Sequence, residues 1–245
     1  MQLHVLGADD KPNLAPRTVW GVGGPTLSVV VPTFNEAANV NKLIANLEAA
    51  LAGIFWEVIF VDDNSADGTA AIAKSVAARD PRVRCLHRIG RRGLAGACIE
   101  GILSSSAPYV AVIDGDLQHD ENCLPAMLQS AASGKSDLVV GSRYAEGGGI
   151  GTFSRIRRSL SRLAVHCMQV ISGVALTDPV SGFFLMRRVA FDAVAPKLSS
   201  AGFKILSDIV ISSGSTLRIS EQPYIFRSRN AGDSKFDSQI GLEFL

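Results

Sequence analysis

Two carboxylates around a glycine form the most distinctive chemical pattern of the chain. The triplet Asp114-Gly115-Asp116 directly follows the apolar run Tyr109–Ile113. Carboxylate oxygens suit a hard divalent ion such as Mg²⁺ or Mn²⁺, and an ion held there can neutralise a diphosphate as it departs. Gly115 lets the backbone approach a ligand closely. The same triplet can instead serve only as a turn or a helix cap, and its residues alone leave that alternative open.

A second polar loop contains the adjacent carboxylates Asp62 and Asp63, which follow the apolar run Glu57–Val61. Because like charges repel, this pair predicts hydrogen-bond donors or a cation nearby. The ribose hydroxyls and base N–H groups of a nucleotide are suitable donors. The residues that follow, Asn64-Ser65 and Asp67-Gly68, are interpreted as turn residues, and Asp67 is also expected to cap the next helix.

The segment Pro32–Glu36 is a third polar loop, and it follows the apolar run Leu27–Val31. Phe34 can lie along a nucleobase, and Glu36 can accept a hydrogen bond from the edge of that base. Glu36 can also sit in the first turn of a helix, where the helix dipole favours a carboxylate. The two interpretations of Glu36 do not exclude each other.

Apolar runs alternate with helical patterns from Leu27 onward, and this predicts the elements that position the loops. The near-continuous apolar character of the runs indicates strands covered on both faces. Strands are predicted at Leu27–Val31, Glu57–Val61, Val83–Leu86, Tyr109–Ile113 and Asp137–Val140, and helices around Val40–Leu51 and at Thr69–Ala78, Gly93–Leu103, Asn122–Ala132, Arg158–Ile171 and Val189–Val194. The alternation predicts an α/β fold with a mostly parallel, doubly wound sheet and helices on both faces. Ligands of such sheets bind at the carboxyl ends of the strands, where all three loops are expected.

Composition and residue spacing narrow the classes of function. The chain has 245 residues, 47% of them hydrophobic, and a net charge of +1, so it offers no global field to attract nucleic acid. The four cysteines and four histidines show no zinc-ligand spacing. No Ser/His/Asp or Cys/His arrangement for nucleophilic catalysis is evident. No run reaches the ~18–20 apolar residues of a membrane span, and Met1–Gly24 lacks a signal-peptide pattern.

The same patterns predict the domain organisation. Residues 1–25 lack periodicity and are expected to form a flexible N-terminal arm. Residues 26–237 are expected to form one catalytic domain, and residues 238–245 to begin an amphipathic or membrane-proximal segment. The basic stretch Arg155–Arg162 is compatible with an anionic lipid surface and equally with an ordinary amphipathic core helix.

An ordered series of motifs between Leu27 and Asp237 resembles glycosyltransferase family 2, and within it the dolichyl-phosphate (polyprenyl-phosphate) mannose synthase branch. Besides the polar loops, the series comprises Gly90–Leu94, Asp114–His119, Val140–Tyr144, Asp178–Phe184 and Gly202–Leu206. The resemblance implies a GT-A fold and a metal-dependent, inverting hexosyltransferase. It favours transfer of mannose from GDP-mannose to a polyprenyl or dolichyl phosphate, by a peripheral protein on the cytoplasmic face of a membrane.

The resemblance also implies roles for individual residues. It places the nucleotide-sugar donor at Pro32, Thr33, Phe34, Glu36, Asp63, Asp114, Gly115, Arg229 and Lys235. It places Mg²⁺ or Mn²⁺ at Asp114, Asp116 and Gln118, and the acceptor phosphate at Arg143, Arg157 and Ser161. Asp116, Gln118 and Arg143 would then be the catalytic residues. One departure from the pattern is Asp120, which stands where relatives usually have proline.

A phosphate acceptor agrees with the lack of an obvious catalytic base. The second pKa of a phosphate monoester is about 6, so the attacking oxygen is already negatively charged near neutral pH. Catalysis then depends on positioning and electrostatics, with arginine binding phosphate oxygens bidentately.

Two alternatives remain. The first is transfer from a UDP-sugar to a polysaccharide or other glycan, although the QxxRW-type motif of polymer-building relatives is absent. The second, ranked lower, is a nucleotidyltransferase, for which Pro32–Glu36 supplies no glycine-rich phosphate loop.

Overall fold

The computed structural model describes residues 24–149, 176–199, 205–214 and 216–228. The predicted helix Arg158–Ile171 and the predicted segment 238–245 lie outside these residues, as does nearly all of the predicted N-terminal arm. In the described residues, no helix combines the length and the apolar character that crossing a bilayer requires.

The described ranges form a seven-stranded sheet with the strand order β3-β2-β1-β4-β6-β5-β7. The strands are β1 Leu27–Thr33, β2 Trp56–Asp62, β3 Val83–His87, β4 Tyr109–Val112, β5 Leu138–Ser142, β6 Phe184–Arg187 and β7 Ile219–Pro223. Only β6 among them runs antiparallel to its neighbours. All five predicted strands are confirmed with ends within two residues, whereas β6 and β7 were not predicted.

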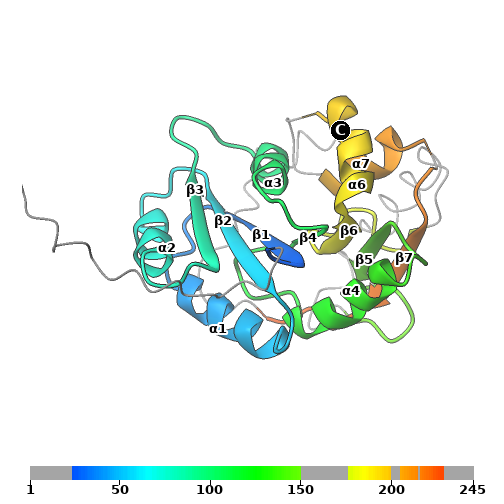
Figure 1. Ribbon diagram of the computed structural model, residues 1–245, viewed down its shortest axis with the longest axis horizontal. Helices are drawn as coiled ribbons and strands as arrows, with labels where there is room; N and C mark the ends of the chain where they lie inside the picture. The colour runs from blue at the N-terminus through cyan, green and yellow to red at the C-terminus, as the bar shows by residue number, and fades with distance from the viewer. Residues whose placement is uncertain (1–23, 150–175, 200–204, 215, 229–245) are drawn as a thin grey trace, which may run out of the picture.

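Helices cover both faces of this sheet, as predicted (Figure 1). Helices α1 Val40–Ala50, α2 Thr69–Ala77 and α4 Leu124–Ala132 pack on one face. Helices α3 Leu94–Leu103, α6 Arg188–Val194 and α7 Ile205–Ser212 pack on the other. Two short 3₁₀ helices, Glu121–Cys123 and Ala195–Lys197, precede α4 and follow α6.

The continuous apolar runs exist because each strand serves two cores. Successive strand side chains point to opposite faces, so Val29 and Val31 belong to the core under α1, α2 and α4, while Val30 belongs to the core under α3, α6 and α7. All seven residues of β1 are buried. A strand exposed on one face would alternate apolar and polar residues instead.

The turn residues between β2 and α2 behave as predicted. Asn64 and Gly68 both adopt positive φ, at 59° and 93°, a region that asparagine and glycine tolerate. The Asp67 carboxylate accepts hydrogen bonds from the backbone N–H of Thr69, the first residue of α2, and from that of Ala37. Burial opposes ionisation, but these bonds lower the pKa of Asp67 below its usual value. The N-cap residue of α2 is Gly68 rather than the predicted Asp67. Asp67, one residue earlier, connects the first N–H of α2 to the loop after β1.

Candidate active site

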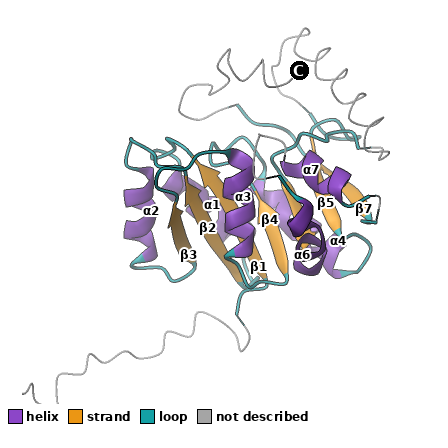
Figure 2. Cartoon of the chain, turned by 90° about the horizontal axis from the view of Figure 1, so that it is seen from above, coloured by secondary structure: helices purple, strands orange, loops and turns teal. Residues whose placement is uncertain are grey.

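The three polar loops lie together at the carboxyl edge of the sheet, because β2, β1 and β4 are adjacent parallel strands. Thr33 pairs with Asp62 in the strand register, and the N–H of Asp63 donates to the Thr33 carbonyl at 3.0 Å. On the other side, the N–H of Ile113 donates to the Val30 carbonyl at 3.1 Å. The same edge faces upward in Figure 2, where the loops gather above the strands.

Residues 113–121, which follow β4 and include Asp114 and Asp116, form the acidic loop. Its carboxylates lie in a tight turn. Leu117 adopts a φ of 64°, and the N–H of Gln118 donates to Oδ1 of Asp116 at 3.2 Å. Asp116 is 8% exposed, whereas the side chain of Asp114 is 37% exposed. Carboxylate oxygens such as these are ligands that a hard divalent cation prefers.

Glycines leave room for this loop on both sides. A Cβ atom on Gly115 would lie 3.1 Å from Cγ2 of Thr33, and one on Gly182 would lie 2.7 Å from Oδ2 of Asp114. Gly115 therefore lies close against the end of β1, whereas its predicted close approach to a ligand stays a prediction. Gly182, from the motif Asp178–Phe184, determines where the Asp114 carboxylate can lie.

His119 is a neutral histidine behind the acidic loop. It is 3% exposed and stacks on Phe183 with a centroid distance of 5.4 Å. Burial lowers the pKa of His119 to about 4. The backbone N–H of Asp114 donates to its Nδ1 at 3.3 Å, so the proton of the neutral ring is on Nε2, 3.7 Å from Oδ2 of Asp114.

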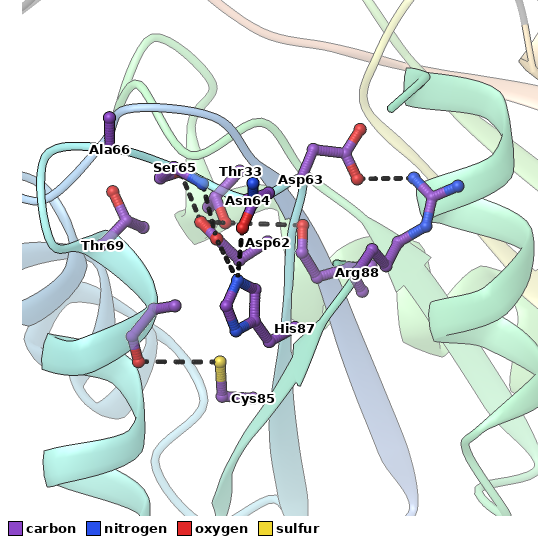
Figure 3. Close-up of polar contacts among 12 residues, drawn as sticks. Thr33, Asp62, Asp63, Asn64, Ser65, Ala66, Thr69, Cys85, His87 and Arg88 are labelled. Atoms are coloured by element: carbon purple, nitrogen blue, oxygen red, sulfur yellow. Dashed lines mark hydrogen bonds and ion pairs between the residues drawn. The ribbon is translucent and has the colours of Figure 1, made fainter. Parts of the chain in front are cut away.

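The protein itself supplies hydrogen-bond donors to Asp62 and Asp63, the carboxylate pair at the end of β2. Asp63 accepts from Nη1 of Arg88 at 2.5 Å and from the N–H of Gly93 at 2.7 Å. Asp62 accepts from the N–H and hydroxyl of Ser65 at 3.0 and 2.5 Å. Figure 3 shows the Asp63 carboxylate directed toward Arg88 rather than toward Asp62. A carboxylate has about four acceptor sites, so Asp63 can accept further hydrogen bonds besides these two. Its contact with a nucleotide is a proposal.

The loop after β1 is held in place by its neighbours. The N–H of Glu36 donates to the Thr69 hydroxyl at 2.9 Å, and its Oε2 accepts from Asn39 at 2.7 Å. The guanidinium carbon of Arg92 lies 4.5 Å from the centroid of the Phe34 ring, a cation–π contact. Pro32 and Thr33 are buried at the end of β1.

Arg143 forms a buried bidentate ion pair rather than standing alone. Its Nε and Nη2 donate to the two carboxylate oxygens of Asp178 at 2.7 and 2.8 Å. Asp178 is fully buried. Burial alone would lower the pKa of Arg143, but the Asp178 hydrogen bonds and charge raise it above its usual value. Arg143 also lies over the Phe226 ring at 5.4 Å, so its charge stays fixed near the acidic loop.

The acidic loop has the donor set that a divalent ion bound by a diphosphate needs. The described residues contain no cluster of three His, Cys, Asp or Glu side chains that could hold a metal. Magnesium, however, is commonly held by one or two carboxylates together with substrate phosphates, and Asp114 and Asp116 supply two. Nε2 of Gln118 donates to the Arg227 carbonyl at 3.1 Å, so the amide oxygen is the atom of Gln118 that could bind a cation.

Four predicted site residues, Arg157, Ser161, Arg229 and Lys235, lie outside the described residues. Conversely, the structure identifies Arg88, Asp178, His119 and Arg227 as partners of predicted site residues, and the sequence assigned them no role. Arg88 could have been predicted from the sequence, because it directly follows β3 just as Asp63 directly follows β2. Arg227 lies in the basic stretch Phe226–Lys235, but only Arg229 and Lys235 of that stretch were given roles.

Comparison with known proteins supports a family assignment. Residues 28–195 match the family model described as glycosyl transferase family 2. The chain is 34% identical over 225 residues to a dolichol-phosphate mannosyltransferase from Pyrococcus furiosus, covering 89% of this chain and 61% of that protein. It is 31% identical to the Mycosarcoma maydis protein of the same name and 30% identical to that of Saccharomyces cerevisiae. These matches cover 90% and 89% of this chain, and 77% and 84% of those relatives.

Solved structures support the fold. A glucosyl-3-phosphoglycerate synthase from Mycobacterium tuberculosis with Mn²⁺, UDP-glucose and phosphoglyceric acid aligns with a TM-score of 0.65 at 19% identity, covering 87% of this chain and 77% of that one. The same synthase with Mg²⁺ and UDP aligns at 0.66 and 20% identity, with the same coverage. The mostly parallel sheet, the family model and the relatives at 30% identity or more agree, and the chain belongs to glycosyl transferase family 2.

Proposed function

We propose that this chain transfers mannose from GDP-mannose to dolichyl or another polyprenyl phosphate. The observation that carries the proposal is the position of Asp114 and Asp116, at the end of a central strand and against the loop after β1. This is where a nucleotide-sugar diphosphate would meet carboxylates able to hold a divalent ion. The names of three relatives that match about 90% of the chain support the sugar and the acceptor.

The proposed cofactor is Mg²⁺ or Mn²⁺, held by Asp114, Asp116 and the amide oxygen of Gln118. Such an ion supplies Lewis-acid stabilisation of the departing diphosphate. Asp116 is held by the N–H of Gln118, and Gln118 by the Arg227 carbonyl, so the chain fixes its ligand atoms in advance. Preorganised groups cost little reorganisation at the moment of reaction.

The proposed acceptor phosphate attacks the anomeric carbon without a strong base, because it is already ionised near neutral pH. Two anions must then approach each other, and cations have to offset their repulsion. Arg143 is suited to this role, because Asp178 engages its Nε and Nη2 and leaves contact with a phosphate to Nη1. Attack from the side opposite the diphosphate inverts the anomeric configuration, which NMR of the product measures. A retained configuration would exclude this direct displacement.

A transfer assay tests the donor and the acceptor together. The protein is incubated with radiolabelled GDP-mannose, UDP-glucose or UDP-N-acetylglucosamine, with Mn²⁺ or Mg²⁺ and a polyprenyl phosphate, and label is counted in the organic phase. We expect label from GDP-mannose. Label from a UDP-sugar, or label found only in a glycan acceptor, would replace the proposal with the alternative of a UDP-dependent glycan transferase.

Replacing Asp116 by alanine tests the carboxylate assignment. We expect Asp116→Ala to lower transfer by roughly a hundredfold or more, because charge stabilisation at the diphosphate is lost. The matched control is Asp192→Ala, which removes an exposed carboxylate on α6 whose partner is Arg188. Undiminished transfer by Asp116→Ala would show that Asp116 is not an active-site residue.

The proposed location is the cytoplasmic face of a membrane, where the protein would be peripheral. The support is the basic stretch Arg155–Arg162 beside apolar residues in the sequence, together with a lipid acceptor. We expect the protein to sediment with anionic vesicles at low ionic strength and to dissociate at high salt, because exposed charges are screened. Equal binding to neutral vesicles would contradict this electrostatic contribution.

A further inference from the structure

Arg227 joins the acidic loop to the segment after β7 through its side chain. Its Nη2 donates to Oδ1 of Asp120 at 2.5 Å, and its Nη1 donates to Oε2 of Glu121 at 2.7 Å. Nη1 also lies 3.3 Å from the His119 carbonyl oxygen, which accepts from it. One guanidinium therefore contacts three consecutive residues of the loop.

The backbone of Arg227 forms a second, reciprocal connection with Gln118. The Arg227 N–H donates to the Gln118 carbonyl at 2.8 Å, and the Arg227 carbonyl accepts from Nε2 of Gln118 at 3.1 Å. The two residues are 109 positions apart in the chain. Because Nε2 is engaged, the carboxamide oxygen of Gln118 has a fixed orientation.

Aromatic contacts strengthen the same junction. Tyr224 and Phe226 both lie 5.7 Å from the His119 ring, measured between centroids. His119 in turn accepts the N–H of Asp114. The segment Tyr224–Arg227 therefore contacts the acidic loop at Gln118, His119, Asp120 and Glu121 and reaches Asp114 through His119.

We propose that Arg227 is a positioning residue that sets the geometry of the acidic loop for the diphosphate and its divalent ion. The role of Arg227 toward the diphosphate and its ion rests on the proposed function. The contacts of Arg227 with the acidic loop do not depend on that function. The Asp120 carboxylate accepts from one half of the guanidinium. Glu121, whose side chain is 6% exposed, anchors the other half of the guanidinium.

A purely structural role predicts a different result. The Arg227 and Asp120 side chains are 36% and 29% exposed, and ion pairs of this exposure contribute little to stability. If Arg227 only stabilised the fold, its loss would resemble the loss of any comparable ion pair. Arg218 provides that comparison, because it pairs with Asp137 just before β7, next to the opposite end of that strand.

The experiment compares Arg227→Gln with Arg218→Gln in the full chain. The first measurement is hydrogen exchange of the backbone amides in residues 116–121, without added ligand. We expect Arg227→Gln to accelerate exchange in this loop by roughly tenfold, because opening of the loop becomes easier, and Arg218→Gln to leave it unchanged. Equal exchange in the two variants would overturn the inference.

The second measurement is Mn²⁺ affinity in the presence of GDP, followed by the electron paramagnetic resonance signal of free Mn²⁺. We expect Arg227→Gln to weaken binding by roughly tenfold or more, as the loss of groups that orient metal ligands does. Arg227→Lys should recover part of the affinity, because one ammonium can still pair with Glu121 or Asp120. Binding by Arg227→Gln equal to that of the unmodified chain would also overturn the inference.

These outcomes separate the inference from the proposed function. If the unmodified chain transfers no sugar from any donor, yet Arg227→Gln still accelerates exchange in residues 116–121, the proposed function fails and the structural coupling stands. Asp120→Asn and Glu121→Gln repeat the test if Arg227→Gln does not fold, because each removes one charged acceptor and keeps the arginine. Unchanged exchange and unchanged Mn²⁺ affinity in both of these variants would refute the coupling.

Discussion

The Asp114 carboxylate lies between His119 of its own loop and Gly182 of a distant part of the chain. The His119 ring accepts the Asp114 N–H and has its Nε2 at 3.7 Å from the carboxylate. Gly182 borders the carboxylate on another side, where a Cβ atom would be 2.7 Å away. Because the atom that would be displaced is the end of a side chain, a methyl group there moves the carboxylate rather than the backbone.

The first prediction at the residue scale concerns Gly182→Ala. We expect it to lower transfer by about tenfold or more, because misplacing a reacting group by about 1 Å can cost a hundredfold. Its unfolding free energy should change by less than about 0.5 kcal/mol, as for most substitutions away from the core. Transfer and urea unfolding measure the two quantities, and full activity in Gly182→Ala would contradict the constraint.

Gly101→Ala is the matched comparison with the opposite expectation. A Cβ atom on Gly101 in α3 would meet the Val30 side chain and lie 2.8 Å from Cγ2 of Val61. Overpacking costs about 1–3 kcal/mol, which exceeds the gain of up to about 1 kcal/mol in helix propensity. We expect lower stability with the transfer rate of the folded protein retained.

At the scale of elements, Asp137 precedes β5 and connects it by hydrogen bonds to the end of β6 and the start of β7. Its N–H donates to the Arg218 carbonyl at 2.7 Å, and its carbonyl accepts the N–H of Arg187 at 2.9 Å. Its carboxylate accepts from the side chains of Arg218 and Arg187. The short strands β6 and β7 thereby gain side-chain contacts in addition to their few ladder hydrogen bonds.

The stability that the Asp137 carboxylate contributes depends on pH, which gives a second prediction. Hydrogen bonds from Arg218 hold the pKa of Asp137 well below its usual value of 3.8. A lowered carboxylate pKa stabilises the fold fully above pH 3.8, and the contribution is lost as the pH falls below that value. The stability gap between the unmodified chain and Arg218→Gln should therefore be constant near neutral pH and shrink in acid.

Urea unfolding between pH 3 and pH 7 measures this gap. Arg79→Gln serves as control, because the Nε of Arg79 donates to the uncharged Ser75 carbonyl, and its gap should not depend on pH. A gap for Arg218→Gln that is equally large at pH 3 and at pH 7 would show that Asp137 is not its source.

At the scale of the whole molecule, two hydrophobic cores share one sheet. Phe60 of β2 lies in the core under α1, α2 and α4, and Phe184 of β6 lies in the core under α3, α6 and α7. Both side chains are fully buried. Because the strands between them contribute side chains to both cores, loss of packing on one face should weaken the other.

The third prediction follows from this arrangement. Phe184→Ala should lower the unfolding free energy by about 3–5 kcal/mol, the usual cost of truncating a buried phenylalanine. Trp56 lies in the opposite core, so its fluorescence in a Trp20→Phe background reports on the face that was not altered. We expect the Trp56 transition and the far-UV circular dichroism transition to shift together. A Trp56 transition that stays in place would show that the two cores unfold independently.

Much of the fold and the outline of the site could be predicted from the sequence, because these depend on local patterns. Continuous apolar runs such as Leu27–Val31 indicate strands buried on both faces, and the helical spacing between them requires parallel neighbours. Parallel strands end at one edge, so Thr33, Asp63 and Asp114 could be predicted to lie near one another. The strand β7, with the residues Ile-Ser-Glu-Gln-Pro, lacks such a pattern and was missed.

Only the tertiary structure decided which groups pair within the site. Arg88 binds Asp63 across 25 residues, Asp178 binds Arg143 across 35, and Arg227 binds Gln118 across 109. The sequence determined that carboxylates would meet at the carboxyl edge, because strand direction and periodicity are local properties. It could not determine their partners, because these depend on the order of strands in the sheet and on the close packing of loops from distant parts of the chain.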